Sequence, residues 1–351
     1  MLNHVKNIFL INVLFLNVLF GGEWDRLMNL KGYWKFSIGD NMEWASADYN
    51  DSDWEEIRVP RSWEDEGFHG YNGYAWYRTS FSAPLEFKGK TLYLYLGYID
   101  DVDEVYVNGK MIGSTGTFPP NYQTAYNAFR KYPIPRDFIK YNKENVISVR
   151  VYDSQQSGGI VSGDIGLYSL TSLPIAYSLE GYWKFSTGDK PEWKDSNFND
   201  SKWKDVMVPS LWESQGYQDY DGFAWYRKKV TLPTDLLSKR LVLVMGKIDD
   251  FDQVYVNGQL VGQTGDFDIP QKQNFHGTSE YNEFRGYYIP DNLLKGATEV
   301  VIAVRVYDGY IGGGIYQGPV GFTTQDKYTN YWKDYKKKEK KNWWEIFFGN
   351  D

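Results

Sequence analysis

The chain of 351 residues contains no cysteine and only three histidines. Without cysteine it has no disulfide, no thiolate nucleophile and no thiolate metal site. The histidines His4, His69 and His276 are scattered, and His69 falls opposite a glutamine in the repeat described below, so no histidine-based triad or metal cluster can be assembled. A Gly-x-Ser-x-Gly elbow and a phosphate-cradling loop are also missing. Carboxylates are the remaining candidates for chemistry.

Positive charge is also scarce, because the formal net charge is −8. Nucleic-acid binders need a basic face that displaces counterions from phosphates. The only lysine-dense stretch is Lys333–Lys341, close to the C-terminus. The charge balance therefore excludes nucleic acid as an expected partner.

The N-terminus predicts a secretory signal peptide over residues 1–22. Lys6 precedes a mainly apolar run, Ile8–Phe20, and Gly21 and Gly22 follow. The run is short for a membrane span, which needs about 20 residues. We expect a secreted, periplasmic or cell-envelope protein, with an uncleaved anchor or a core segment as the alternatives.

The rest of the chain repeats itself. The segment Gly32–Ser37 returns as Gly181–Ser186, and Ala75–Arg78 returns as Ala224–Arg227, both 149 residues later. After Thr115-Gly116 the offset becomes 155, so the second copy carries six additional residues in one loop. A repeat of this size is a whole domain rather than a solenoid unit. We predict two domains, 23–173 and 174–324, followed by a tail, 325–351.

Each copy is predicted to be all-β. Aromatic residues make up 18% of the chain, which suits strands. Leu92–Leu96 and Ile147–Val151 alternate apolar and polar or aromatic residues with a period of two. Asn108-Gly109 between two such runs is typical of a two-residue hairpin turn. No stretch keeps a helical period beyond a turn or two, so two jelly-roll β-sandwiches in series are expected.

Five tryptophans of the first copy have a partner in the second. They admit two interpretations, as sugar-stacking platforms or as buried anchors of core and loops. Trp34 and Trp76 lie in strand-like runs and are expected in the core. Trp63 and its partner Trp212 lie in loops and are the better platform candidates.

Carboxylates cluster at one predicted strand end. Asp100, Asp101 and Asp103 lie together, and Asp249, Asp250 and Asp252 repeat them. Such a set can bind a structural Ca²⁺, which prefers oxygen ligands. It can equally cap turns or pair with arginines such as Arg78 and Arg130. A glycosidase needs two carboxylates facing each other across a cleft, which this cluster does not supply.

The motifs shared by the copies resemble a known family. Trp-Tyr-Arg, Ile-Asp-Asp-x-Asp-x-Val-Tyr-Val-Asn-Gly and Val-Arg-Val-Tyr-Asp followed by Gly-Gly-Ile are similar to the sugar-binding, galactose-binding-like domain of family 2 glycoside hydrolases. They also resemble accessory domains of bacterial sialate O-acetylesterases. The resemblance implies that Asp153 and Asp308 contact sugar hydroxyls. The candidate ligand-binding residues are Asp153, Asp308, Trp63, Trp212, Arg130, Arg285, Gly159 and Gly314.

The resemblance does not extend to the catalytic barrel of that family. We therefore expect a non-catalytic protein that binds a glycan or glycoside, without an obligatory cofactor. The alternatives are an envelope scaffold module and an accessory part of a glycoside hydrolase or esterase system, with a separate carbohydrate-active enzyme as partner. Glycines before Ile160 and Ile315 would let a ligand or another backbone approach closely.

The tail combines lysines with aromatic residues. Tyr331-Trp332 and Tyr335 precede the lysines, and Trp343-Trp344 follow them. The pattern fits a helix at a membrane or partner surface, or a helix that packs its aromatics onto the sandwiches. Membrane contact is expected only through the tail or the signal peptide.

The copies differ most in their loops. Ser114–Ala128 differs from Gln263–Glu283 in length, and Ser154-Gln155 is replaced by Gly309-Tyr310. The sequence therefore predicts two similar frames with non-equivalent sites.

Overall fold

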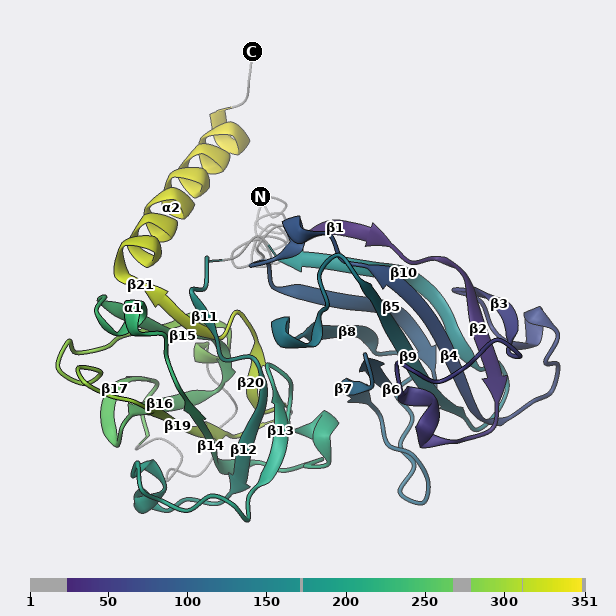
Figure 1. Cartoon of the computed structure of the whole chain (residues 1–351), viewed down its shortest axis with the longest axis horizontal. Coiled ribbons are helices and arrows are strands. Elements are labelled where there is room, and N and C mark those ends of the chain that lie inside the picture. The colour runs from purple at the N-terminus through teal and green to yellow at the C-terminus, as the bar shows by residue number, and fades with distance from the viewer. Residues whose placement is uncertain (1–23, 171–172, 268–278, 311, 349–351) are drawn as a thin grey trace, which may run out of the picture.

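A computed structural model describes residues 24–170, 173–267, 279–310 and 312–348. The predicted signal peptide and most of the six-residue insertion lie outside these ranges. The described residues form four antiparallel sheets that pair into two β-sandwiches lying side by side (Figure 1). The all-β prediction is confirmed.

The first sandwich packs a six-stranded sheet on a four-stranded one. The six-stranded sheet has the order β3-β2-β4-β9-β6-β7 and the other has the order β1-β10-β5-β8. In chain order the strands are β1 (Trp24–Asn29), β2 (Gly32–Ile38), β3 (Glu55–Val59), β4 (Gly73–Ser82), β5 (Leu92–Asp100), β6 (Val102–Val107), β7 (Lys110–Thr115), β8 (Phe129–Ile134), β9 (Glu144–Asp153) and β10 (Gly159–Leu170).

The second sandwich repeats this plan. Its six-stranded sheet has the order β13-β12-β14-β19-β16-β17, and its other sheet has the order β11-β21-β15-β18, with β20 also paired to β15. The strands are β11 (Tyr177–Ser178), β12 (Gly181–Thr187), β13 (Lys204–Val208), β14 (Gly222–Val230), β15 (Leu241–Asp249), β16 (Phe251–Val256), β17 (Gln259–Thr264), β18 (Arg285–Tyr288), β19 (Val300–Asp308), β20 (Gly314–Gln317) and β21 (Gly321–Thr324).

Within the described ranges, helical structure is confined to short turns and the tail. The 3-10 turns are η1 (Met42–Ala45), η2 (Glu64–Glu66), η3 (Leu85–Phe87), η4 (Arg136–Phe138), η5 (Pro191–Lys194), η6 (Glu213–Gln215) and η8 (Glu280–Asn282). The α-helices are α1 (Thr234–Leu237) and α2 (Gln325–Phe348).

The strand pattern read from the sequence is confirmed. Leu92, Leu94 and Leu96 on β5 point into the first core and are almost fully buried. Asn108 and Gly109 between β6 and β7 have φ angles of 52° and 77°, as a hairpin turn with two left-handed residues requires. Each sandwich has its own main hydrophobic core with two tryptophans below 2% exposure, and a third, Trp76 or Trp225, is equally buried in a smaller aromatic cluster.

The sandwiches contact each other directly. The Tyr182 hydroxyl donates to the Met111 carbonyl at 3.1 Å, and the Ser114 hydroxyl donates to the Ser214 carbonyl. Met207 of the second copy packs within the first core. A groove of about 450 Å³ runs between the copies beside these contacts.

The tail forms one helix whose beginning rests on the second sandwich. Tyr328 and Tyr331 pack, together with Phe284, against a small cluster of Leu173, Ile175, Val242 and Val244. Trp332 meets Phe284 edge to face. Beyond this region α2 extends away from the sandwiches (Figure 1). The first turns of α2 therefore follow the second interpretation of the tail, a helix that packs its aromatic residues onto the sandwich. Among the described helices, none has the length and hydropathy needed to cross a bilayer.

One carboxyl is buried where the copies meet. Glu180 lies beside Tyr93 of the first copy and Gly318 of the second. The side chains of Glu180 and Tyr93 are nearly inaccessible to solvent. Burial raises the pKa of Glu180 to about 7, against the opposing effect of the Arg136 charge and the Val320 N–H. Its Oε2 accepts no hydrogen bond from the described residues.

The protein is expected to lose stability as pH rises, in part through Glu180. Its folded-state pKa lies above the unfolded value, so the stability it contributes is complete below about pH 4.5 and is lost as pH rises through 7. Glu180→Gln should therefore increase the free energy of unfolding by roughly 2–4 kcal/mol at pH 8 and change it little at pH 4.5. Denaturant unfolding at both pH values measures this, with exposed Glu86→Gln as control. Equal pH slopes for wild type and Glu180→Gln would refute it.

Candidate functional site

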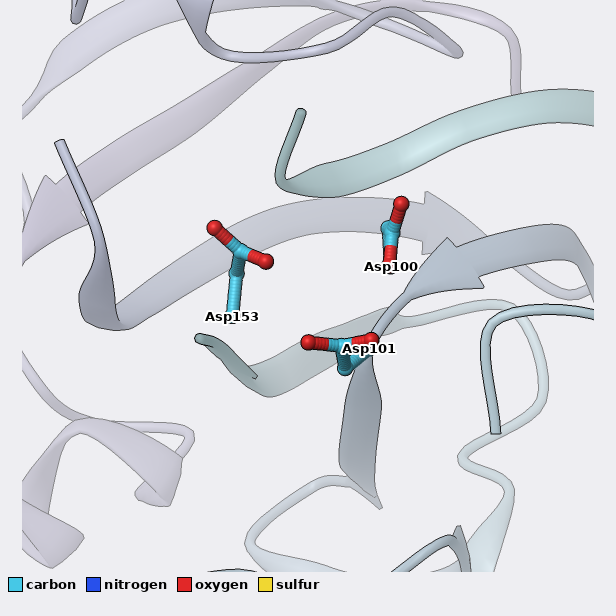
Figure 2. A group of neighbouring side chains, drawn as sticks. All are labelled: Asp100, Asp101 and Asp153. Atoms are coloured by element: carbon cyan, nitrogen blue, oxygen red, sulfur yellow. The ribbon is translucent and has the colours of Figure 1, made fainter. Parts of the chain in front are cut away.

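Three aspartates converge at one end of the first sandwich. Asp100 ends β5, Asp101 follows it, and Asp153 ends β9. The Asp101 amide donates to the Tyr152 carbonyl at 3.2 Å, which brings the end of β9 beside the end of β5. One carboxylate oxygen from each residue lies within 4.8 Å of the other two. Figure 2 shows the three carboxylates grouped in this way, and we call them the first triad.

The triad members differ in their hydrogen bonds. Asp101 accepts from the side chains of Thr124 and Tyr122 and from the backbone amide and hydroxyl of Ser154. Asp153 Oδ1 accepts from the Gln155 amide at 3.1 Å, while its Oδ2 is buried and accepts no hydrogen bond from the described residues. Asp100 is the most exposed of the three, so the triad reaches solvent through Asp100.

These differences separate the acidities of the three groups. Burial, together with the neighbouring Asp101 carboxylate, raises the pKa of Asp100 to about 7. Burial also raises the pKa of Asp153 to about 7, although the Gln155 N–H opposes it. Burial acts in the same sense on Asp101, but its hydrogen bonds from Thr124, Tyr122 and Ser154 outweigh it and hold the pKa at about 2. At neutral pH the triad is therefore close to taking up a proton or another positive charge.

The second copy builds the same arrangement from Asp249, Asp250 and Asp308, the second triad. Burial and the nearby Asp250 and Asp308 charges raise the pKa of Asp249 to about 8. Asp308 Oδ1 accepts from the Tyr310 amide at 3.1 Å, and its Oδ2 again accepts no hydrogen bond from the described residues. The repeated frame thus places three carboxylates together twice.

Asp103 does not belong to this cluster, so its predicted role as a metal ligand is wrong. Its Oδ1 lies 2.7 Å from Nε of Arg130, with both side chains fully buried, and its Oδ2 accepts from the Tyr132 hydroxyl at 2.5 Å. The alternative of pairing with an arginine describes Asp103 correctly. Asp153, which the sequence places more than fifty residues away, takes the third position in the triad.

Arg130 and Arg285 are buried, which contradicts their prediction as direct ligand contacts. Besides Asp103, the Arg130 guanidinium donates to the carbonyls of Ala125, Ala128 and Asp101. Arg285 does the same with Asp252 and with the carbonyls of Glu280, Glu283 and Asp250. Each arginine therefore holds a surface loop from its buried side. Its hydrogen bonds go to acceptors inside the protein.

Trp63 and Trp212 are also buried, with 0% exposure, so neither can be a sugar-stacking platform. The glycine turn after the strand covers each ring: a Cβ atom on Gly158 or Gly313 would lie 2.1 Å from the indole Cζ2 of Trp63 or Trp212. Trp63 further packs on Phe36 and Tyr71. The second interpretation, a buried anchor, is correct for both.

Gly159 and Gly314 are required by the core rather than by a ligand, which corrects the prediction. A Cβ on Gly159 would lie 2.1 Å from the Tyr77 hydroxyl, and one on Gly314 would lie 2.3 Å from the Tyr226 hydroxyl. Both glycines have φ near +105°, which side-chain-bearing residues rarely adopt. The close neighbour is a buried tyrosine of the same sandwich.

The exposed aromatic residues near the triads are not the tryptophans that the sequence indicated. Tyr126 is 57% exposed and lies two residues after Thr124, the donor to Asp101. Tyr98 and Phe129 are also exposed and meet edge to face. In the second copy Tyr281 corresponds to Tyr126 and is similarly exposed. The shared Tyr-x-x-Phe-Arg spacing before the buried arginine is the sequence signal that could have identified these tyrosines.

Comparison with known proteins supports the resemblance seen in the motifs. Residues 39–157 match the family model described as the second all-beta domain of beta-galactosidase. A beta-glucuronidase of Formosa agariphila is 28% identical over 131 residues, which cover 34% of this chain and 12% of that protein. A beta-galactosidase of Bacteroides ovatus is 27% identical over 147 residues, covering 38% and 16%. The likeness to an all-β domain of family 2 glycoside hydrolases is thus confirmed for the first copy.

The matched segment is a small part of those relatives. It spans about an eighth to a sixth of their length. Among solved structures, Bacteroides uniformis beta-glucuronidase aligns over 83% of this chain and 28% of its own, with 16% identity and a TM-score of 0.36. The matched residues 39–157 contain all three members of the first triad.

The buried pair Arg130–Asp103 should be essential for stability. Arg130→Ala leaves the Asp103 charge buried without its partner and is expected to lower the free energy of unfolding by about 3–5 kcal/mol. Arg61→Ala removes the exposed member of an ion pair with Glu66 and should change the free energy of unfolding by less than about 1 kcal/mol. Urea unfolding of the full chain compares the two. Similar losses for both variants would contradict the structural role of Arg130.

Proposed function

We propose that the chain is a non-catalytic carbohydrate-binding protein of the cell exterior or envelope, and that it holds a glycan at the ends of its sandwiches. The observation that carries this proposal is the first triad, whose carboxylates lie within 4.8 Å of one another beside exposed tyrosines. Carboxylates accept hydrogen bonds from sugar hydroxyls, and such charged hydrogen bonds contribute about 1.5–3 kcal/mol each. The expected signal peptide supports the location.

The neighbouring rings supply the apolar half of such a site. A pyranose has an apolar C–H face that packs on an aromatic ring, and the ring hydroxyl of tyrosine remains in water. Tyr126 is presented by the loop that Arg130 holds from beneath, and Asp101 binds the same loop through Thr124. Charge and ring are therefore fixed relative to each other before a ligand arrives, which reduces the entropy lost on binding.

The two copies are proposed to differ in what they bind. Tyr98 of the first copy corresponds to Lys247, whose Nζ donates to the Asn282 side chain. Gln155 next to Asp153 corresponds to Tyr310 next to Asp308, and Tyr310 is 60% exposed. The second site thus lacks the exposed ring of Tyr98, has a buried cation in its place, and adds an exposed ring two residues after Asp308. We therefore expect ligands or affinities that are not the same.

A second candidate function is an accessory role beside a glycoside hydrolase. The curated relatives carry the matched segment within longer proteins named for beta-galactosidase or beta-glucuronidase activity. Such an accessory would present a glycan to a separate enzyme. Hydrolysis of the bound glycan by a co-purifying glycosidase, with no turnover by the isolated chain, would favour this role over binding alone.

Glycan binding should depend on the triads. Asp153 and Asp308 have 0% exposure, which contradicts their prediction as direct sugar contacts, and Asp100 and Asp249 are the triad members that reach solvent. On a glycan array and in affinity gels, first with β-galactoside and β-glucuronide ligands, the variant Asp100→Ala/Asp249→Ala should lose about 10- to 100-fold in affinity, equivalent to one charged hydrogen bond. The single variants should lose unequal amounts if the sites differ. A folded wild type that binds no glycan would refute the proposal.

The tyrosine rings should contribute separately. Tyr126→Ala/Tyr281→Ala is expected to weaken glycan binding about 3- to 10-fold while leaving thermal stability nearly unchanged, because both side chains are largely in solvent. Tyr33→Ala removes an equally exposed ring on β2 and serves as the control. Equal affinities of the two variants would exclude stacking on Tyr126 and Tyr281.

A further inference from the structure

Asp100, Asp101 and Asp153 concentrate negative charge at one end of the first sandwich. Among the described residues, no lysine or arginine forms an ion pair with Asp100, Asp101 or Asp153, and the nearest buried arginine, Arg130, is paired with Asp103. Three carboxylates this close repel one another unless a positive charge joins them. Sugar hydroxyls can donate hydrogen bonds here, but they carry no charge to offset this repulsion.

The spacing suits one ion of the size of Ca²⁺. Calcium binds carboxylate oxygens at about 2.3–2.6 Å, so oxygens on opposite sides of one ion lie roughly 5 Å apart. The three oxygens of each triad lie within 4.8 Å of one another. The ligand set consists only of oxygen, which favours a hard cation over zinc or copper.

A second observation comes from the deepest carboxylate of each triad. Asp153 and Asp308 have 0% exposure, and Oδ2 of each accepts no hydrogen bond from the described residues. Figure 2 shows one of the two Asp153 carboxylate oxygens on the side that faces Asp100 and Asp101. A buried carboxylate oxygen without a partner is costly, so such groups are normally paired or coordinate a metal.

The same unpartnered oxygen occurs in both copies although the following loops differ. Ser154-Gln155 follows Asp153, whereas Gly309-Tyr310 follows Asp308. The backbone amide two residues later nevertheless binds Oδ1 in each copy and leaves Oδ2 directed elsewhere. Because the two loops differ in sequence, the shared orientation of the two carboxylates is set by the β-sandwich that the copies have in common.

We propose that each triad binds one divalent cation of the calcium type, with Asp100, Asp101 and Asp153 as ligands in the first copy and Asp249, Asp250 and Asp308 in the second. The remaining coordination positions belong to water or to hydroxyl groups of a ligand. Ion binding by the carboxylates does not require a bound glycan.

Terbium luminescence tests the proposal without any sugar. Tb³⁺ replaces Ca²⁺ at oxygen sites and emits when a nearby indole transfers energy to it. Trp63 supplies that indole, because a Cβ on Gly158 would lie 2.1 Å from its ring and 2.8 Å from Asp153 Cβ. The full-length chain, first treated with a chelator, should show two saturable Tb³⁺ sites from which excess Ca²⁺ displaces the ion.

Isosteric variants assign the sites. Asp153→Asn and Asp308→Asn should each leave one Tb³⁺ site, with at least a tenfold loss of affinity at the altered triad, and the double variant should leave none. Asn keeps the shape of Asp and the hydrogen bond from the following amide. Asp164→Asn, which alters an exposed partner of Lys31, should keep both sites.

Thermal stability provides a readout that does not rely on luminescence. Millimolar Ca²⁺ should raise the unfolding temperature of the wild type and of Asp164→Asn but not of the double variant, because a ligand stabilises only the form that binds it. Absence of saturable luminescence in the wild type, or two retained sites in the folded double variant, would overturn the proposal. If only one of the two single variants loses a Tb³⁺ site, the proposal is overturned for the triad whose variant keeps both sites.

Discussion

The buried pair between Arg130 and Asp103 is the interaction on which the candidate site depends. Asp103 lies on β6 in the six-stranded sheet and Arg130 lies on β8 in the four-stranded sheet, so the pair joins the two layers of the sandwich. Two charges removed from water are tolerated only when their remaining hydrogen-bonding groups are also satisfied. The Tyr132 hydroxyl and three backbone carbonyls meet that requirement.

The same hydrogen bonds place the surface chemistry. Two of the carbonyls belong to the loop that carries Tyr126, and the third belongs to Asp101 of the first triad. A structural ion pair thereby sets the distance between an exposed ring and a group of carboxylates. Arg285 and Asp252 repeat this construction in the second copy. Duplication has preserved the buried support, whereas the exposed Tyr98 of the first copy corresponds to the buried Lys247 of the second.

Carboxyl groups are buried both in the triads and where the two copies meet, but their surroundings differ. Glu180 is a single carboxyl enclosed where the sandwiches meet, with Arg136 as the charge that opposes its raised pKa. In each triad three carboxylates share one position near the surface, and Asp100 or Asp249 gives access from solvent. Burial alone explains Glu180 as part of a packed contact. Glu180 Oε2 also accepts no hydrogen bond from the described residues, so the proximity of three carboxylates and their access to solvent are what make the triads the candidate sites.

The sequence by itself determined the duplication, the all-β architecture and the β6–β7 hairpin, because alternation with a period of two and an Asn-Gly turn are local properties. It also located Asp100, Asp101, Asp153 and their counterparts as residues of interest. Only the tertiary structure decided that Asp153 rather than Asp103 completes the triad, since this depends on β9 ending beside β5. It likewise decided that Trp63 is buried and Tyr126 exposed, because the side on which a loop residue packs is set by distant strands and not by its neighbours in sequence.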